Sequence, residues 1–286
     1  DVSIGHIEGL KSLDNIVEEK ASICSGQTQK GLAIIPSGIE KFSQLKAKVR
    51  DFGPNVISFG DDESSDVRIS TIEVLDNAIG STIIDQKQNL WNVKLKTAGK
   101  HYMKNAAALL TLVSSLNLDL SKAILALQSW SPLAGRGQVL EVKLKASNFN
   151  EAIHLIDESY NANPSSVKSS LETLACIFTN KKGKGQYSRR IAVLGDMLEL
   201  GFSEIQEHVN ISKFARLDKI DKVYCVGSRM KKLFDVLPNS KRGFWTETAE
   251  EMQHVLVNKL KNGDIIMIKG SFSMGMKTIV NKLKNI

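Results

Sequence analysis

Polar side chains crowd together in one short stretch of the chain, Asp157–Pro164 (DESYNANP). An apolar run that includes Ile153, Leu155 and Ile156 precedes this stretch, and its final proline suits the first turn of a helix. The order predicts a buried strand, a polar turn and then a helix. Ligands of α/β proteins bind at the carboxyl ends of such strands. Acids, amides and hydroxyls placed there can hydrogen-bond a ribose or a phosphate, so the stretch predicts a ligand site.

Two further loops carry polar groups directly after expected strands. Gly195–Gly201 (GDMLELG) follows one apolar run and Lys269–Ser271 (KGS) follows another. A lysine, consecutive backbone N–H groups and a hydroxyl suit an anionic group, although either loop is also explained as a plain turn. Because the carboxyl ends of parallel strands share one edge, we expect both loops to lie beside Glu158 and Gly227.

The first half of the chain holds two weaker signals. His101 and Asn105 are four residues apart, so they share one face of an expected helix. An amide such as Asn105 can read an adenine edge by donating and accepting at once, but helix capping explains it equally well. His6 precedes a helix that contains Lys20. Two residues are too few for a metal site, and a lysine that follows two glutamates is ordinarily a surface salt-bridge residue.

Composition narrows the class of protein. The chain has 286 residues, 42% of them hydrophobic and 24% charged, which is typical of a soluble globular protein with room for two domains. Its net charge of +7 comes from scattered lysines, which argues against nucleic-acid binding. No apolar run approaches ~18 residues, so we expect no membrane insertion. Three widely spaced cysteines form neither a metal pattern nor a disulfide framework, which fits a reducing cytoplasm.

The expected elements change rhythm near the middle of the chain. In the first part we expect helices at 7–25, 100–116 and 121–129, the last capped by Ser121, and short strands at 31–35, 56–59, 67–74, 81–84 and 90–95. Several of these strands suit an antiparallel flap. The irregular segment 130–137 suits a domain linker. After it we expect strands at 139–143, 152–156, 190–194, 222–226, 243–245 and 264–268, and helices at 164–178, 203–214, 229–234, 249–260 and 274–283. Such alternation predicts an α/β fold with a mainly parallel sheet covered on both faces.

Taken in order, these pieces resemble the Mur ligases, the ATP-dependent amide ligases of peptidoglycan synthesis. The nearest resemblance is to the MurF type, which joins D-alanyl-D-alanine to UDP-N-acetylmuramoyl-tripeptide. The strings in Ser159–Pro164 and Gly195–Gly201 are specific to that type. The other residues that carry the resemblance are Gly5–Gly9, Lys20, His101, Asn105, Gly135, Arg136, Asp157, Glu158, His208 and Lys269–Ser271.

The resemblance implies a fold and a reaction. Residues 1–133 would be the C-terminal part of the central ATP-binding domain, a mixed sheet with helices, and residues 134–286 the Rossmann-like C-terminal domain. In the family the tripeptide carboxylate attacks the γ-phosphate of ATP, which gives an acyl phosphate and ADP. The amine of the dipeptide then attacks the acyl carbon and expels phosphate. Cationic groups and Mg²⁺ must offset charge during phosphoryl transfer. We expect a cytoplasmic monomer with these substrates as its partners.

The resemblance also implies a role for each site residue. His6 and a carbamylated Lys20 would hold a second Mg²⁺, because a carbamate turns an ammonium into an anionic oxygen ligand. Two groups of residues follow. The ATP side comprises Asn105 and His101 near adenine, Arg136 at the phosphates, Glu158 at the ribose, and Ser159, Tyr160, Asn161 and Asn163 around them. The substrate side comprises Asp196, Leu198, Lys269 and Ser271.

The chain departs from the family pattern in several places. The domain that grips the UDP sugar is absent, and so is the part of the central domain that carries the Gly-rich phosphate loop. Tyr102 stands where the family commonly has Asn, and Pro36–Gly38 stands where an Asn/Asp-rich turn is common. We therefore expect a fragment that does not ligate by itself. The alternatives are a related ligase that adds an ordinary amino acid, such as a folylpolyglutamate or diaminopimelate ligase, a nucleotide-binding or scaffolding protein without catalysis, and an α/β domain without a catalytic function.

Overall fold

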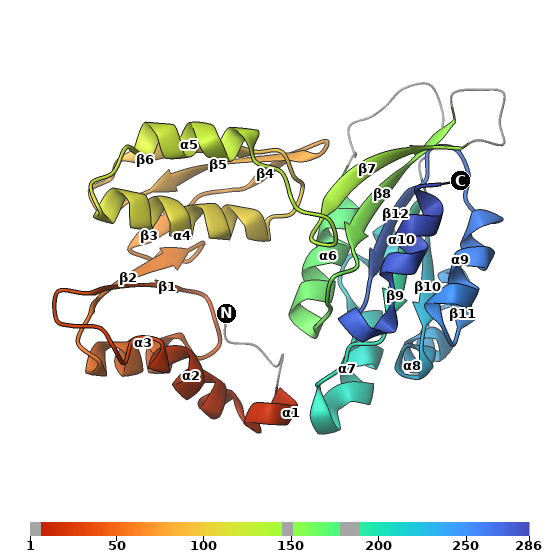
Figure 1. The fold of residues 1–286 in the computed structure, drawn as a ribbon, viewed down its shortest axis with the longest axis horizontal. Helices are drawn as coiled ribbons and strands as arrows, with labels where there is room; N and C mark the ends of the chain where they lie inside the picture. The colour runs from red at the N-terminus through yellow and green to blue at the C-terminus, as the bar shows by residue number, and fades with distance from the viewer. Residues whose placement is uncertain (1–6, 145–150, 178–188, 286) are drawn as a thin grey trace. The chain divides into compact units, whose positions relative to one another are not determined.

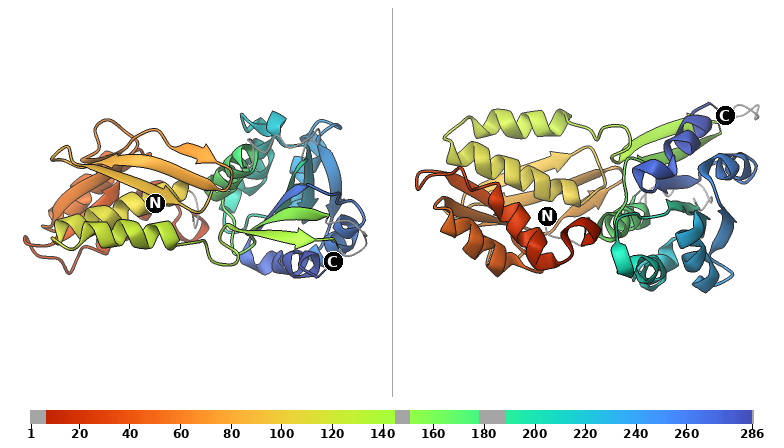
Figure 2. Two further views of the ribbon diagram at one scale, coloured as in Figure 1. Left: turned by 90° about the horizontal axis from the view of Figure 1, so that it is seen from above. Right: turned by 60° about the horizontal axis from the view of Figure 1, so that its bottom comes forward.

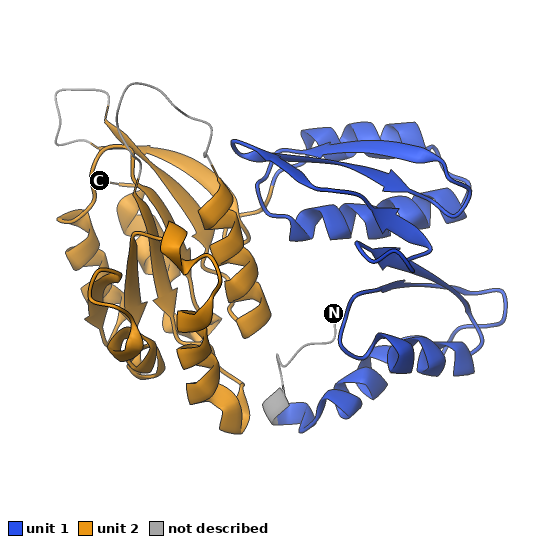
Figure 3. Cartoon of the chain, turned by 180° about the vertical axis from the view of Figure 1, so that it is seen from behind, with its two compact units in different colours: residues 1–131 blue, residues 132–286 orange. Residues whose placement is uncertain are grey.

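The computed structural model describes residues 7–144, 151–177 and 189–285 (Figure 1). The chain divides into two compact units, Asp1–Ser131 and Pro132–Ile286, which we call unit 1 and unit 2 (Figure 3). The expected boundary lay at 133/134, two residues later. Within the described ranges, no helix is both long enough and apolar enough to cross a membrane.

Unit 1 is built on a six-stranded mixed sheet. Its strands are β1 (Leu32–Pro36), β2 (Asn55–Gly60), β3 (Val67–Ile69), β4 (Glu73–Leu75), β5 (Ala78–Ile84) and β6 (Leu90–Leu95). β1, β2 and β3 run parallel, whereas β5 pairs antiparallel with β3, β4 and β6. The antiparallel flap expected from the sequence is therefore the β3–β6 part of this sheet. The single strand expected at 67–74 is two strands, β3 and β4.

Helices cover the unit 1 sheet in two layers. They are α1 (Ile7–Leu10), α2 (Leu13–Ser22), α3 (Phe42–Asp51), α4 (His101–Ser115) and α5 (Leu120–Ser129). α2 and α3 pack on β1 through a core that includes Ile16, Ile35 and Val49. α4 packs against β1, β2, β3 and β5, and α5 packs against β6, through a second core that includes Leu110 and Trp91. Since β5 and β6 alternate buried and accessible residues, their other face is left for polar side chains.

Two helix predictions in unit 1 need correction. The helix expected at 7–25 is broken into α1 and α2, because Lys11 adopts a left-handed φ of 67° and Ser12 caps a new helix. α3 was not expected, because only Leu45 and Val49 of its ten residues are buried and the rest are mostly polar. Such a narrow apolar stripe gives a weak periodic signal.

Unit 2 is a doubly wound α/β domain. Its sheet has the order β11-β10-β9-β12-β8-β7, in which only β7 runs antiparallel to its neighbour. The strands are β7 (Gln138–Lys143), β8 (Ala152–Glu158), β9 (Arg190–Gly195), β10 (Lys222–Val226), β11 (Arg242–Thr246) and β12 (Ile265–Lys269). The expected α/β class with a mainly parallel sheet is confirmed.

Helices lie on both faces of this sheet (Figure 2). They are α6 (Pro164–Cys176), α7 (Glu204–Asn210), α8 (Ser228–Val236), α9 (Ala249–Val257) and α10 (Lys277–Leu283). α9 and α10 share one apolar core with the sheet, and α6 and α8 pack on β12, β9 and β10. The single helix expected at 203–214 is α7 between two 3₁₀ turns. The helices that follow β8 and β9 therefore lie on one face of the sheet, and α10, which follows β12, lies on the other. In open α/β sheets, ligands bind at the point where successive connections change from one face to the other.

The start of α5 gives a direct test of how this helix is capped. Asp119, not the expected Ser121, is the N-cap, and its carboxylate accepts the backbone N–H of Lys122 at 3.0 Å. Replacing Asp119 by Ala should lower the free energy of unfolding by about 1 kcal/mol, because a helix N–H loses its acceptor. Urea unfolding of the chain measures this change.

Ser121→Ala is the matched control, because Ser121 is exposed in the first turn of the same helix. It should change the free energy of unfolding by less than about 0.5 kcal/mol. Equal losses in the two variants would contradict the assignment of Asp119 as the cap.

Candidate functional site

The carboxyl ends of four parallel strands in unit 2 form one edge. Lys269 at the end of β12 lies in register with Glu158 on β8 and with Leu194 on β9, and Val226 on β10 is opposite Gly195. The loops that follow these strands therefore begin side by side. This confirms the expectation that the polar residues after separate strands meet at one edge.

Glu158 and Lys269 form a buried pair of opposite charges at this edge. Glu158 is 8% exposed and Lys269 is 3% exposed. The Lys269 Nζ lies 3.5 Å from Glu158 Oε2 and donates to the backbone O of Asn161 at 2.9 Å. The lysine thus joins β12 to the turn after β8. A charge buried this deeply needs a partner, so each residue fixes the position of the other.

Burial dominates the electrostatics of this pair. It raises the pKa of Glu158 above its ordinary value, and the nearby Lys269 only partly opposes that shift. Burial likewise lowers the pKa of Lys269, and Glu158 opposes the shift. The charged forms would gain from further hydrogen bonds, so donors such as ribose hydroxyls fit the Glu158 carboxylate.

Asp157 stabilises the turn through buried hydrogen bonds and an ion pair. Its side chain is fully buried, accepts hydrogen bonds from Ser159 Oγ at 2.6 Å and Ser159 N at 3.2 Å, and receives the Lys277 Nζ at 2.7 Å. Burial alone would raise the pKa of Asp157, but the bonds from Lys277 and Ser159 outweigh it and hold the pKa below its usual value. Asp157 is therefore an anionic support for the turn.

The asparagines of the turn also hold its shape. Asn163 is the N-cap of α6: its Oδ1 accepts the N–H of Ser166 at 2.8 Å, and the Ser166 hydroxyl accepts the N–H of Asn163 at 3.0 Å. Asn161 Oδ1 accepts the N–H of Ala162 at 2.9 Å. Such local bonds fix a polar turn before any ligand binds. Tyr160, in contrast, leaves 47% of its surface exposed.

The segment before β7 is fastened to the same turn. The Arg136 guanidinium lies 4.0 Å from the centre of the Tyr160 ring. The backbone N–H of Tyr160 donates to Gly135 O at 3.0 Å, and Gly137 N–H donates to Asp157 O at 2.7 Å. Gly135 has a left-handed φ of +80°, and a Cβ there would lie 3.1 Å from the Tyr160 Cβ. The segment whose composition suits a domain linker thus also holds the Arg136 cation beside this turn.

Asp196 supports the neighbouring helix. It is 2% exposed, and its carboxylate accepts the N–H of Met230 at 2.7 Å and that of Arg229 at 3.2 Å at the start of α8. Gly227 has φ +102°, and a Cβ there would lie 2.5 Å from the Asp196 Cγ. Both carboxylate oxygens therefore have partners within the protein.

Ser271 and His208 hold the Gly195–Gly201 loop. The Ser271 hydroxyl accepts the N–H of Leu198 at 2.9 Å. His208 is fully buried, its Nε2 accepts the N–H of Met197 at 2.9 Å, and its Nδ1 lies 2.6 Å from the carbonyl O of Glu204. This pattern fits a neutral ring with its proton on Nδ1. Burial lowers the pKa of His208.

The remaining candidate residues belong to unit 1. His101 and Asn105 lie in the first two turns of α4, where Asn105 is exposed and the His101 ring lies 4.1 Å from that of Tyr102. Lys20 is exposed in the last turn of α2. His6 lies outside the described residues. Within the described ranges, no group of three His, Cys, Asp or Glu residues is arranged to hold a metal ion.

Lys277 and Arg229 contact site residues but were not expected as candidates from the sequence. Lys277 is the first residue of α10, where a cation is electrostatically unfavourable. That position is a signal that the lysine has a carboxylate partner, here Asp157. Arg229 bonds Glu204 through Nε at 2.6 Å and also faces Asp196, but its sequence context carries no such signal.

His208 makes the stability of unit 2 depend on pH. Because its pKa in the folded protein lies below the unfolded value of 6.5, its contribution is complete above pH 6.5 and is lost as the pH falls through the folded pKa. His208→Gln should therefore reduce the loss of stability between pH 7.5 and 5.5 by up to about 1.4 kcal/mol per pH unit. Urea unfolding across this range measures the slope.

His254→Gln is the matched control, because His254 is exposed on α9. In this variant the free energy of unfolding should depend on pH as it does in the unchanged protein. Parallel slopes for the His208→Gln variant and the unchanged protein would contradict a neutral, buried His208.

Comparison with known proteins agrees with this architecture. Residues 1–113 match the Mur ligase middle domain and residues 141–272 match the Mur ligase glutamate ligase domain. A UDP-N-acetylmuramoyl-tripeptide–D-alanyl-D-alanine ligase of Rickettsia prowazekii is 22% identical over 98% of this chain and 59% of its own length. The structure resembles MurF from Acinetobacter baumannii, with TM-score 0.81 and 23% identity over 100% of this chain and 58% of that one.

A MurF ligase from Thermotoga maritima in complex with ADP has the same fold, with TM-score 0.80 and 21% identity over 99% of this chain and 60% of that chain. The chain thus spans about three fifths of the length of these relatives. Both family matches lie in the expected order, one in each unit. The chain belongs to the Mur ligase family.

Proposed function

We propose that the chain is part of a MurF-type ligase. In this proposal the whole protein uses ATP to form the C–N bond between D-alanyl-D-alanine and UDP-N-acetylmuramoyl-tripeptide, in the cytoplasm and as a monomer. Curated relatives that carry this name match 97–100% of the chain, and one solved neighbour holds ADP. The printed sequence contains no Gly-x-x-x-x-Gly-Lys-Ser/Thr segment, so we assign ligation to the longer protein.

The observation that carries this proposal is the buried Glu158–Lys269 pair at the strand ends of unit 2. The carboxylate and the ammonium lie beside Arg136, whose positive charge further lowers the pKa of Lys269. An acid that gains from hydroxyl donors next to two cations suits the ribose and the phosphates of a nucleotide. Glu158 would accept ribose hydroxyls, and Arg136, held on the exposed Tyr160, would face the phosphates.

The contacts also separate the residues that would bind nucleotide or substrate from those that stabilise the turn. We propose that Ser159, Asn161 and Asn163 act by holding the turn, because their side chains bond Asp157, Ala162 and Ser166. Asn105 and His101 stay on the adenine side, Lys269 joins the nucleotide side through Glu158, Leu198 and Ser271 stay near the substrates, and Asp196 positions their loop.

The chemistry sets what these groups must do. The tripeptide carboxylate is a poor electrophile until its oxygen attacks the γ-phosphate and ADP leaves. The acyl phosphate then loses phosphate to the attacking amine of the dipeptide. Cations at the phosphates stabilise the charge that develops in the first step. Mg²⁺ supplies the same stabilisation when it is bound, and we assign it to His6 and a carbamylated Lys20 in the whole protein.

Glu158→Gln tests the nucleotide site. The neutral amide keeps the shape of the side chain but loses charge-assisted bonds to hydroxyl donors, so ADP affinity should fall by about ten-fold or more. Titration calorimetry of the chain with ADP measures the affinity, and thermal unfolding confirms that the variant is folded.

Glu141→Gln on β7 is the control, because Glu141 is exposed. It should leave ADP affinity unchanged. Unchanged affinity in the folded Glu158→Gln variant would remove Glu158 from the nucleotide site.

The proposal also fixes what the isolated chain does. The 286-residue chain, mixed with ATP, Mg²⁺, the tripeptide substrate and D-alanyl-D-alanine, should release no phosphate above the background, because it contains no phosphate loop. A colorimetric phosphate assay measures this. Dipeptide-dependent phosphate release from the chain would show that these residues suffice for ligation.

A further inference from the structure

The surplus positive charge of the chain belongs to unit 2. That unit holds 24 of the 38 lysines and arginines but only 16 of the 31 aspartates and glutamates, so its formal charge is +8. Unit 1 has a formal charge of −1, which gives the +7 of the whole chain. A surplus confined to one unit attracts anions to the surface of that unit.

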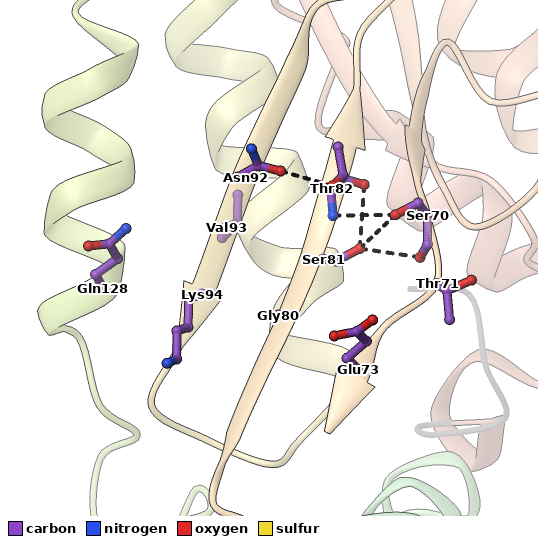
Figure 4. Close-up of a pocket in the computed structure, with 10 residues that line it drawn as sticks. All are labelled: Ser70, Thr71, Glu73, Gly80, Ser81, Thr82, Asn92, Val93, Lys94 and Gln128. Carbon is purple, nitrogen blue, oxygen red and sulfur yellow. Dashed lines mark hydrogen bonds between the residues drawn. The ribbon is translucent and has the colours of Figure 1, made fainter. Parts of the chain in front are cut away.

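The exposed sheet of unit 1 shows the contrast. The open face of β4–β6 forms a polar hollow (Figure 4). The Ser70 and Ser81 hydroxyls lie 3.4 Å apart there, and the Thr82 hydroxyl donates to Asn92 Oδ1 at 2.9 Å. One acid and one base line the hollow, so it has no net charge. A charged partner is therefore not expected at this face.

β11 is the outer strand of the unit 2 sheet and contacts α8 and α9 (Figure 1). It contains a β-bulge, because Gly243 and Phe244 lie opposite the single residue Tyr224 of β10. A Cβ at Gly243 would lie 2.5 Å from the Tyr224 ring, so this position requires glycine. A bulge on an outer strand opposes pairing with a strand of another molecule. A second copy of the chain is therefore an unfavourable partner for this edge.

The bulge also determines which side chains share a face. Arg242 and Trp245 are three residues apart and would lie on opposite faces of a regular strand. With the extra residue, both lie beside α8. The Arg242 guanidinium lies 5.7 Å from the centre of the Phe234 ring, and the Lys231 Nζ lies 5.5 Å from the centre of the Trp245 ring. Phe244, within the bulge, leaves 51% of its surface exposed.

The cations around these rings are mostly not neutralised by carboxylates. Arg242 donates to two backbone carbonyls at the end of α8, at 2.7 and 2.9 Å. The Lys222 Nζ donates to the carbonyl O of Arg242, and the Lys241 Nζ donates to two carbonyls before β10. Lys232 is exposed on α8. Within the described ranges, no carboxylate lies within ion-pair distance of these four cations.

One further cation, Lys231, is paired with Asp235. Of the other nearby acids, Asp221 accepts the backbone N–H of Arg190 at 2.7 Å, and Asp218 lies beside Lys219. Five cations therefore stand beside the rings of Phe234, Phe244 and Trp245 with one acid among them. The five are Lys222, Lys231, Lys232, Lys241 and Arg242, and we call them, together with the three rings, the β11 surface.

We propose that the β11 surface docks the protein on a membrane that contains anionic phospholipids. The negative potential of such a membrane attracts cations, and each lysine or arginine near it is worth about five-fold in affinity. Aromatic side chains are favoured where head groups meet acyl chains, which suits the exposed Phe244 ring. The docking is peripheral, since no described helix is suited to cross a membrane.

Nucleic acid fits this surface less well. Single-stranded bases stack on open ring faces, whereas cations stand over the faces of Phe234 and Trp245. The proposal is independent of the ligase reaction, because the β11 surface contains none of the residues assigned to nucleotide or substrates. Glu158→Gln should bind vesicles as the unchanged chain does. Failure of the nucleotide site and failure of the β11 surface therefore give different results.

The experiment measures how much of the 286-residue chain sediments with phospholipid vesicles. Vesicles of equal parts phosphatidylglycerol and phosphatidylcholine should bind the chain at about 50 mM salt. Their affinity should fall by about ten-fold or more at about 500 mM salt, because salt screens the charges. Vesicles of phosphatidylcholine alone carry no net charge and should bind about ten-fold more weakly or less well still.

Substitutions separate the contribution of the charges from that of the ring. The double variant Lys231→Gln/Lys232→Gln should bind the anionic vesicles about ten-fold or more weakly, with a smaller dependence on salt. Phe244→Ser should weaken binding by about three-fold or more and leave the salt dependence unchanged, because it removes only apolar contact. Thermal unfolding confirms that the variants are folded.

Lys282→Gln/Lys284→Gln is the matched control. Both lysines are exposed at the end of α10, which packs with α9, and the change in net charge is the same. Vesicle affinity should fall by about two-fold at most, because these charges lie outside the β11 surface.

Tryptophan fluorescence locates the lipid. Lipids brominated near the head group quench tryptophan at short range, and Trp245 belongs to the β11 surface, whereas Trp91 and Trp130 belong to unit 1. Brominated anionic vesicles should quench part of the fluorescence of the unchanged chain. They should quench little of the fluorescence of Trp245→Phe.

Absence of binding to anionic vesicles at low salt, equal binding to uncharged vesicles, or equal losses in the α8 and α10 double variants would each overturn the proposal. Quenching that persists in Trp245→Phe would place the lipid elsewhere and overturn it as well. Binding of a single-stranded oligonucleotide at the β11 surface without binding of vesicles would assign the surface to nucleic acid instead.

Discussion

Glu158 and Lys269 place opposite charges inside the carboxyl edge of the unit 2 sheet, where water reaches little of either side chain. Removing two charges from water is costly, and their attraction offsets that cost only when they are held close together. The register of β8 and β12 puts them at the same level of the sheet, and the Asn161 carbonyl takes another of the lysine's hydrogen bonds. The position of the polar turn after β8 depends on this pair.

The surrounding contacts make sense as supports for that turn. Asp157 is tied to Lys277 at the start of α10, and Asn163 closes the start of α6. Gly135 lets Arg136 approach the Tyr160 ring. Each contact is satisfied without a ligand, so the exposed face of Tyr160 and the edge of Glu158 are presented in a fixed arrangement. Sites held in this way bind ligands with less loss of conformational freedom.

The sequence predicts the parallel sheet well, because strands covered on both faces need continuous apolar runs and β8, β9 and β12 have them. It also predicts that the polar loops meet, which follows from topology. It does not predict what each polar group bonds. Asp196 reads as a ligand contact, but its partners are the N–H groups of Arg229 and Met230, more than thirty residues later. α3 was missed because a surface helix with few buried residues gives little periodicity. The N-cap of α5 was placed at Ser121 and not at Asp119 because Ser and Asp are both favourable N-cap residues and stand two positions apart.

The most direct test of the central claim is to map ADP onto the chain by backbone amide NMR. The account predicts that ADP shifts the signals of the 157–163 turn and of Lys269–Ser271, together with Arg136, and that Glu158→Gln reduces these shifts at equal ADP concentration. Shifts confined to other parts of the chain, or shifts of the same size in the folded Glu158→Gln variant, would contradict a nucleotide site built on the buried pair.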